Sequence, residues 1–200
     1  PRLGIGGGTG GRLLGGLAGA LSAVEQRSVA HGGPLRRRGI RGALDRFDAE
    51  VAPHLAACRW QVVHNDLNPH NVLVDAKNPD RIAGVLDFGD MVRTPLVCDL
   101  GVAASYQVEP TAALESLVDF TAAYHKVLPL TPLELSLVPD LTATRMLTTI
   151  CITSWRAARY PENSAYILRN YPSARAGLLA LAALPRADVL SALTAACPME

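Results

Sequence analysis

Lysine is nearly absent from this chain of 200 residues: Lys77 and Lys126 are the only lysines among its nineteen basic residues. Basic and acidic residues almost balance, and the formal net charge is +1. A protein that binds nucleic acid or an anionic membrane through its charge needs a marked basic excess. We therefore predict neither nucleic acid nor a membrane as a partner.

Paired cysteines and long uncharged apolar runs are missing too. Four cysteines lie far apart in the sequence and form no C-x-x-C pair: Cys58, Cys98, Cys151 and Cys197. This pattern disfavours a disulfide scaffold or a zinc site and favours buried thiols in a reducing, cytoplasmic compartment. The most apolar stretch, residues 128–155, is interrupted by Glu134, Asp140 and Arg145, so it is too charged for a membrane span.

The sequence divides into two parts. Residues 1–42 are rich in Gly and Arg, and we expect a flexible segment with one weak helix over residues 12–25. Residues 43–200 have the apolar spacing of a mainly helical α+β lobe. Its first helix is predicted to bury Leu44, Phe47, Val51 and Leu55 on one face, with Pro53 near its end. Further helices are predicted over residues 97–107, 111–127, 132–159, 173–183 and 186–196.

The helix over residues 132–159 has the clearest start signal. Thr131 is suited to the N-cap, Pro132 to the first turn, and Glu134 follows three residues after the cap. Pro139 lacks a backbone N–H, so we expect it to split or kink this helix.

Between the helices the apolar period changes to that of strands. Residues 61–63 form a short strand, residues 64–70 a polar loop, and residues 71–75 and 81–86 the two strands of a β-hairpin. The hairpin brings Asn71 and Asp87 to the same end. An amide oxygen and a carboxylate at that end suit Mg²⁺, which takes oxygen ligands and completes its shell with phosphate and water. Asp66 lies beside this site, where it is able to accept the proton of a substrate hydroxyl.

The run His64-x-Asp66-x4-Asn71, followed by Leu86-Asp87-Phe88-Gly89, resembles the catalytic and metal-binding segments of the aminoglycoside-phosphotransferase and choline-kinase group. The amino-acid sequences of both segments are most similar to those of the hydroxylysine-kinase-like branch. The resemblance implies a protein-kinase-like fold, ATP or GTP as phosphate donor, Asp66 as catalytic base, and Asn71 and Asp87 as magnesium ligands. It also implies that His64 packs beneath the loop.

Four neighbouring residues receive secondary roles. The resemblance implies that Asp99 braces the catalytic loop from the next helix. Asn68 and His70 either touch the substrate or hold the shape of the loop. Asp90 either assists the metal or the substrate, or forms only a local hydrogen bond.

The segment before Asp66 departs from the family pattern. A complete enzyme of this type has an N-terminal lobe with a strand lysine that pairs with the nucleotide phosphates, and no lysine precedes Lys77. We therefore interpret the chain as a C-terminal catalytic lobe whose partner is a missing N-terminal lobe or upstream domain. Alone, we expect it to transfer phosphate poorly or not at all.

Three functions stay open at this stage. The first is transfer of the γ-phosphate to a hydroxyl of a small amine-bearing metabolite or aminoglycoside. The second is a truncated, non-catalytic kinase-like module, which the missing lysine favours. The third is a metal-dependent hydrolase, although the dense His and Asp clusters of such sites are absent from the sequence. Neither the acceptor nor the choice between ATP and GTP follows from the sequence.

Overall fold

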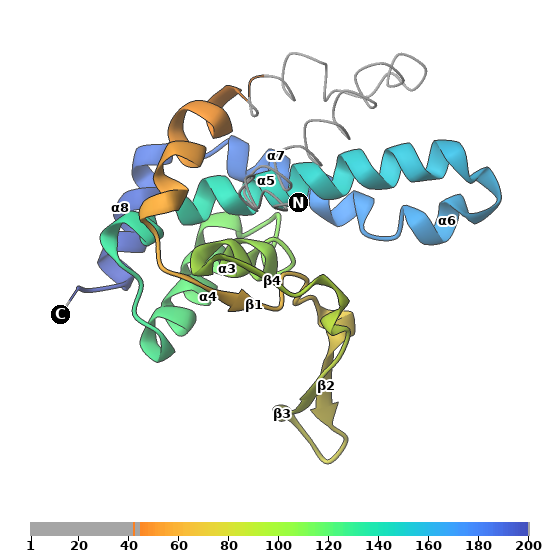
Figure 1. The fold of residues 1–200 in the computed structure, drawn as a ribbon, viewed down its shortest axis with the longest axis horizontal. Coiled ribbons are helices and arrows are strands. Elements are labelled where there is room, and N and C mark those ends of the chain that lie inside the picture. The colour runs from red at the N-terminus through yellow and green to blue at the C-terminus, as the bar shows by residue number, and fades with distance from the viewer. Residues whose placement is uncertain (1–41, 43–44, 200) are drawn as a thin grey trace, which may run out of the picture.

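A computed structural model describes residue 42 and residues 45–199. This part of the chain is mainly helical and includes two small antiparallel sheets, so the predicted α+β class is confirmed (Figure 1). The weak helix predicted over residues 12–25, and nearly all of the Gly- and Arg-rich segment around it, lie outside the described residues.

The first helical segment differs from the single helix predicted. It consists of a π-turn, η2 (Phe47–Val51), followed by a 3₁₀-helix, η3 (Ala52–Ala57). Pro53 lies at the start of the 3₁₀-helix rather than near the end of one long helix. Because its ring removes an N–H donor, Pro53 is unable to continue the hydrogen-bond ladder and fits only a first turn. Phe47 and Val51 are nonetheless buried, as the apolar spacing predicts.

A two-stranded sheet supports the start of the polar loop. Strand β1 (Trp60–Val63) pairs antiparallel with β4 (Val92–Pro95), and Val63 lies opposite Val92. Strand β1 was predicted, whereas β4 was not. The sequence of β4 contains Arg93, Thr94 and Pro95, which lack a clear apolar alternation, and its partner is distant in sequence.

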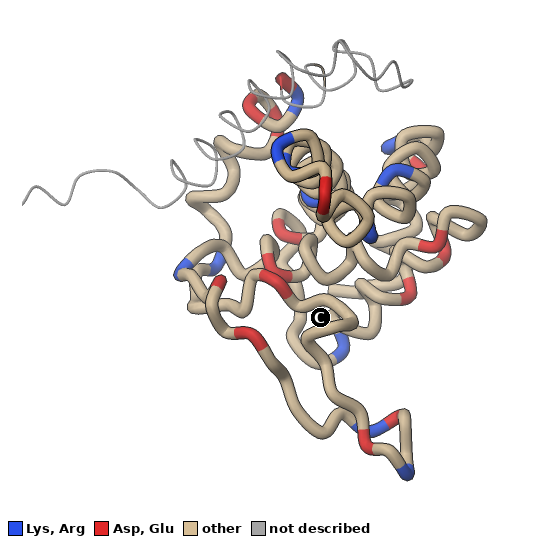
Figure 2. Tube along the Cα trace, turned by 90° about the vertical axis from the view of Figure 1, so that its right-hand side faces the viewer, with Lys and Arg blue, Asp and Glu red and all other residues tan. Residues whose placement is uncertain are grey.

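The predicted β-hairpin is present and projects away from the helices (Figure 1). It consists of β2 (Val72–Asp75) and β3 (Asn78–Val85), which pair antiparallel with irregular register around Val74. The second strand begins earlier than the predicted residue 81. Figure 2 shows residues of both charges at the tip, where Arg81 pairs with Asp75 at 3.4 Å.

Six α-helices follow the sheets. They are α3 (Leu96–Ala104), α4 (Ala113–Val127), α5 (Pro132–Arg159), α6 (Ser164–Ile167), α7 (Tyr171–Ala182) and α8 (Arg186–Ala196). Five of them match predicted helices, and the short α6 was missed. Thr131 and Glu134 form the predicted capping box at the start of α5. The expected split at Pro139 is wrong, because α5 continues through this residue.

The core lies between these helices, where α3 packs closely on α5. Its fully buried members include Leu100, Leu117, Leu137, Met146 and Leu193. Gly101 permits the close approach of α3 and α5, since a Cβ atom added there would lie only 2.7 Å from the Cβ atom of Leu141. Glycine is therefore required by space, not by backbone conformation.

A buried ion pair joins the β1–β4 sheet to the helices. The Glu134 side chain is fully buried and accepts hydrogen bonds from Arg59 Nη2 at 2.6 Å and Arg59 Nε at 3.0 Å. The backbone N–H groups of Arg59 and Thr131 donate to the same carboxylate. Burial by itself raises the pKa of Glu134, but these donors outweigh it and hold the pKa below its ordinary value.

Two global features complete the description. No single described helix is long and apolar enough to cross a membrane; only α7 and α8 together, bent by 96°, match a span in length and composition. All four cysteines are free, and burial raises the pKa of Cys98 to about 11 and that of Cys151 to about 12.

Candidate active site

The polar loop between β1 and β2 is joined to α3 by a hydrogen bond. Asn65 has a left-handed backbone (φ 65°), which Asn tolerates better than most residues. Its N–H donates to Asp99 Oδ1 at 2.7 Å, from the first turn of α3. Burial raises the pKa of Asp99, while the Asn65 hydrogen bond and nearby His64 oppose the rise. The contact fixes the backbone on the N-terminal side of Asp66.

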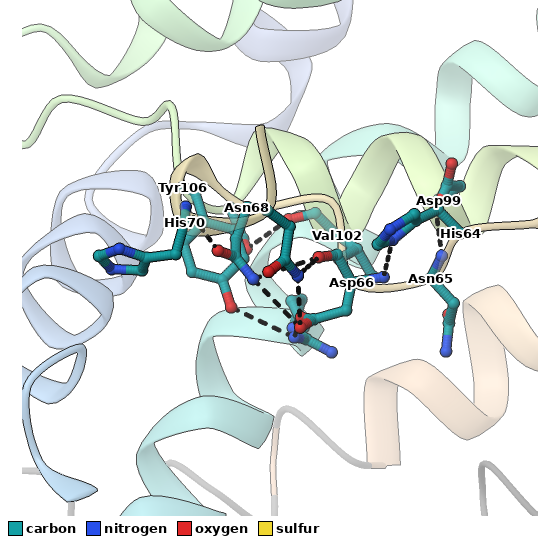
Figure 3. A network of polar contacts seen from close by, with 11 residues as sticks. His64, Asn65, Asp66, Asn68, His70, Asp99, Val102 and Tyr106 are labelled. Carbon is teal, nitrogen blue, oxygen red and sulfur yellow. Dashed lines mark hydrogen bonds and ion pairs between the residues drawn. The ribbon is translucent and has the colours of Figure 1, made fainter. Parts of the chain in front are cut away.

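Asp66 is the centre of the polar network in Figure 3. Its side chain is 22% exposed. Oδ2 accepts hydrogen bonds from Asn68 Nδ2 at 3.1 Å and Asn71 Nδ2 at 3.3 Å, and both amides also donate to the Asp66 carbonyl oxygen. The carboxylate is therefore held in one orientation at the surface of the fold.

Asn71 and Asp87 lie at the same end of the hairpin. The N–H of Leu86, which precedes Asp87, donates to the carbonyl oxygen of Asn71 at 2.8 Å. Asn71 is buried, and because its Nδ2 faces Asp66, its Oδ1 is left without a hydrogen bond to the described residues. Asp87 is exposed and has a left-handed backbone (φ 58°). One of its carboxylate oxygens contacts Gly89 N at 3.4 Å.

The chemistry of this donor set fits a magnesium ion. A carboxylate and an amide oxygen are hard ligands, and Mg²⁺ in phosphotransfer sites needs only one or two protein carboxylates beside the phosphates. Among the described residues no group of three or more His, Cys, Asp or Glu side chains is placed to hold a metal. A magnesium ion held by an amide oxygen and one carboxylate would complete its shell with phosphate and water.

His64 links the loop to the Asp87 segment. Its Nδ1 accepts from Asp66 N at 3.3 Å, which assigns the ring proton to Nε2, the donor to the Leu86 carbonyl oxygen at 2.8 Å. The His64 ring also packs against Phe88, with the ring centroids 5.3 Å apart. Both nitrogens are used in holding the loops together, so His64 lies in a supporting position and not in that of a base.

Asn68, His70 and Asp90 differ in whether their side chains join the hydrogen-bond network around Asp66. Asn68 donates to Asp66 and also accepts from His70 N at 2.9 Å, so it shapes the loop directly. The His70 ring points away from Asp66 (Figure 3). Asp90 is exposed and makes no side-chain hydrogen bond to the described residues. The network therefore includes Asn68, but neither side chain of the other two.

Sequence reasoning missed Arg145, which lies on α5. Its Nη2 contacts Asp66 Oδ1 at 2.6 Å and Tyr106 Oη at 3.2 Å, and the guanidinium lies 5.9 Å from the centroid of the Tyr106 ring. The two charged residues are 79 positions apart, so no short motif includes both. The only available signal is a single arginine within the long apolar stretch of residues 128–155.

Comparisons with known proteins give matches over more than half of this chain. The model of the phosphotransferase enzyme family matches residues 11–128. Hydroxylysine kinase of Mus musculus is 28% identical over 163 residues, which cover 78% of this chain and 41% of that protein. Hydroxylysine kinases of Danio rerio and Bos taurus are 27% and 26% identical, over 70% and 74% of this chain and 40% and 42% of their own lengths. The chain spans about 40% of the length of these curated relatives.

Proposed function

Because the chain belongs to the phosphotransferase enzyme family, we propose that it forms the catalytic lobe of a small-molecule kinase. The reaction is transfer of the γ-phosphate of ATP or GTP to a hydroxyl group of a small, amine-bearing acceptor. The observation that carries the proposal is the placement of Asp66 beside Asn71, at the end of the hairpin where Asp87 also lies.

The proposed roles follow from the donor and acceptor atoms. Asn71 Oδ1 and the Asp87 carboxylate hold Mg²⁺, which supplies neutralisation of the negative charge on the phosphates. Asp66 accepts the proton of the acceptor hydroxyl and orients its oxygen for in-line attack. Asn68 and Asn71 keep the Asp66 carboxylate in place. Asp99 fixes the backbone at Asn65, and His64 links the N–H of Asp66 to the carbonyl oxygen of Leu86.

For the acceptor we propose an amino alcohol of the hydroxylysine type. The three relatives above are named for hydroxylysine, and they match this chain over most of its length. Choline-like alcohols and aminoglycosides share the hydroxyl and the amine but differ in size and charge. The nature of the acceptor is taken up again below.

An upstream lobe is proposed to cover the nucleotide. Several large apolar side chains of the hairpin, β1 and the segment after the hairpin are exposed: Val62, Leu73, Val74, Ile82, Leu86, Phe88 and Met91. We call this set the hairpin surface. A patch of this kind usually marks an interaction site. The curated relatives are more than twice as long as this chain, and the phosphate-binding lysine of a kinase is missing before Lys77.

Nucleotide binding gives the first test. MgATP and MgGTP are titrated by calorimetry into the chain, into Asp87→Asn, and into Asp119→Asn as a control with the same chemical change on an exposed position of α4. We expect magnesium-dependent binding that Asp87→Asn loses and Asp119→Asn retains. Binding that is independent of magnesium, or equal in all three proteins, would contradict the metal site. No binding by any of them would indicate a lobe that needs the proposed upstream lobe to hold the nucleotide.

Phosphate transfer tests the role of Asp66. In the longer protein that includes the upstream lobe, Asp66→Asn keeps the shape of the side chain and removes the base. We expect the turnover number to fall by about 10²–10⁴-fold, the usual contribution of a positioned general base. An Asp66→Asn variant with wild-type turnover would exclude this role.

A further inference from the structure

The ion pair of Asp66 with Arg145 occupies an oxygen atom that the proposed reaction needs. Asp66 Oδ2 already accepts from two amides, and Oδ1 accepts from Arg145 Nη2 at 2.6 Å. The hydroxyl of an acceptor must therefore share or replace this contact to reach the carboxylate.

Two of the three guanidinium nitrogens of Arg145 make no hydrogen bond to the described residues. Its Nη2 serves both Asp66 and Tyr106, but its Nε is buried without any hydrogen-bond partner. Its Nη1 makes no hydrogen bond to the described residues. A guanidinium presents its N–H groups as a planar fork that matches a carboxylate through two parallel hydrogen bonds. The Nη1–Nη2 edge of this fork is suited to a second carboxylate that replaces Asp66 on Nη2.

From this geometry we propose that Arg145 binds the carboxylate of the acceptor and thereby selects a hydroxy amino acid over a purely cationic amino alcohol. The inference rests on the proposed function and names a residue that determines its specificity. When the acceptor carboxylate pairs with Arg145, Asp66 Oδ1 is released to accept the hydroxyl proton. Arg145 thereby exchanges one carboxylate for another without losing its charge partner.

The surroundings of Arg145 support this exchange. Tyr106 holds the guanidinium from the end of α3 through its hydroxyl group and its ring, so the fork is oriented before the acceptor arrives. The Arg145 side chain is 25% exposed, which leaves it open to a ligand while strengthening its charge interactions relative to bulk water. A second cation placed there, as in a polyamine or an aminoglycoside, would be repelled.

The test compares two acceptors that differ only in the carboxylate. Hydroxylysine and its decarboxylated analogue, 1,5-diaminopentan-2-ol, are titrated by calorimetry into the chain, into Arg145→Gln and into Arg186→Gln. The last is a matched control, because Arg186 of α8 pairs with Asp140 of α5 at 2.9 Å rather than with Asp66. We expect the chain to bind hydroxylysine at least about tenfold more tightly than the analogue, the effect of one charge-assisted hydrogen bond. Arg145→Gln should abolish the preference, and Arg186→Gln should keep it.

Other outcomes would overturn the inference. They are equal affinity of the wild-type chain for the two acceptors, a preference that survives in Arg145→Gln, or no binding of hydroxylysine. The wild-type comparison needs no variant, so equal affinities would overturn the inference even where Arg145→Gln fails to fold. Arg145→Lys retains the charge without the fork and should keep only part of the preference. MgATP titration of the same samples reports on the proposed kinase site independently, so failure of one idea is distinguishable from failure of the other.

Discussion

The helical region and the β2–β3 hairpin bury their apolar residues to very different extents. In the helices, Leu117 and Val138 are completely buried. In the hairpin, Ile82 is 66% exposed and Val74 is 52% exposed, although both have the β-branched side chains that strands favour. The helices therefore form a core of their own, whereas the hairpin lacks a covering layer among the described residues.

The candidate site lies along the boundary between these two regions. Asp99 and Arg145 come from helices and Tyr106 from the turn after α3, while Asn71 and Asp87 flank the hairpin strands. The proposed acceptor side is thus built on a packed core, and the proposed metal side on a hairpin with few supports. Substitutions in the helical region should mainly change stability, while substitutions in the hairpin should mainly change binding.

Removal of the buried carboxylate at the start of α5 should have the largest effect on stability. Glu134→Ala leaves Arg59 and the N–H of Thr131 without their partner. Loss of one member of a buried pair costs about 3–5 kcal/mol. Since Arg59 is 43% exposed and water compensates it in part, we expect the lower end, about 3 kcal/mol, in the free energy of unfolding by urea. Asp140→Ala breaks the pair with Arg186, in which the carboxylate side chain is 13% exposed rather than fully buried, and should cost less, about 1 kcal/mol. Equal losses would contradict the distinction.

The close contact of α3 and α5 should be the next most sensitive feature. In Gly101→Ala the new methyl group meets the Cβ atom of Leu141 at 2.7 Å, and the two helices must move apart. Overpacking of this kind costs about 1–3 kcal/mol.

Gly177→Ala is the matched control for that substitution. It meets the end of the flexible Met146 side chain at 2.9 Å, which is able to move, and alanine gains helix propensity of up to about 1 kcal/mol. Its free energy of unfolding should stay within about 1 kcal/mol of wild type. A larger loss in Gly177→Ala than in Gly101→Ala would show that the tight packing has been assigned to the wrong helix pair.

Acid should weaken the helical region through Glu134. Its pKa is lower in the folded chain than the ordinary value of 4.5, so its stabilising contribution is complete above that value and is lost as the pH falls through the folded pKa. Asp99 acts in the opposite direction, because burial raises its pKa and the folded state then binds the proton more readily. Urea unfolding between pH 6 and pH 3 should show a loss in wild type that is smaller in Glu134→Gln and steeper in Asp99→Asn.

Local patterns and distant contacts differed in how far the sequence could predict them. The hairpin and the capping box of Thr131 and Glu134 follow from residues a few positions apart, so alternation and cap chemistry were enough. The contacts of Arg145 with Asp66 and of Arg59 with Glu134 join residues 79 and 75 positions apart. Nothing in either segment alone indicates its partner, because the packing of whole helices brings them together.

Hydrogen bonding explains two further differences. Strand β4 exists because it pairs with β1, although its own residues lack an apolar alternation. The single helix predicted around Pro53 is instead a π-helical turn followed by a 3₁₀-helix. Pro53 lacks the backbone N–H that a continuous α-helix requires at this position. The pairing of Asn71 with Leu86, the residue before Asp87, did follow from the predicted hairpin, but the roles of Asp66, Asn71 and Asp87 stay predictions until binding and turnover are measured.

The smallest effect should come from the exposed face of the hairpin. Ile82→Thr removes an apolar group that is already 66% exposed and keeps a β-branched side chain, so the free energy of unfolding should change by no more than about 0.5 kcal/mol. The same substitution at Ile150, which is 5% exposed on α5, buries a hydroxyl group and should cost about 1–3 kcal/mol. If Ile82→Thr were as costly as Ile150→Thr, the hairpin would have to be covered already within this chain. A neutral Ile82→Thr that weakens association with the upstream lobe of the longer protein would instead place the hairpin surface at the junction between the two lobes.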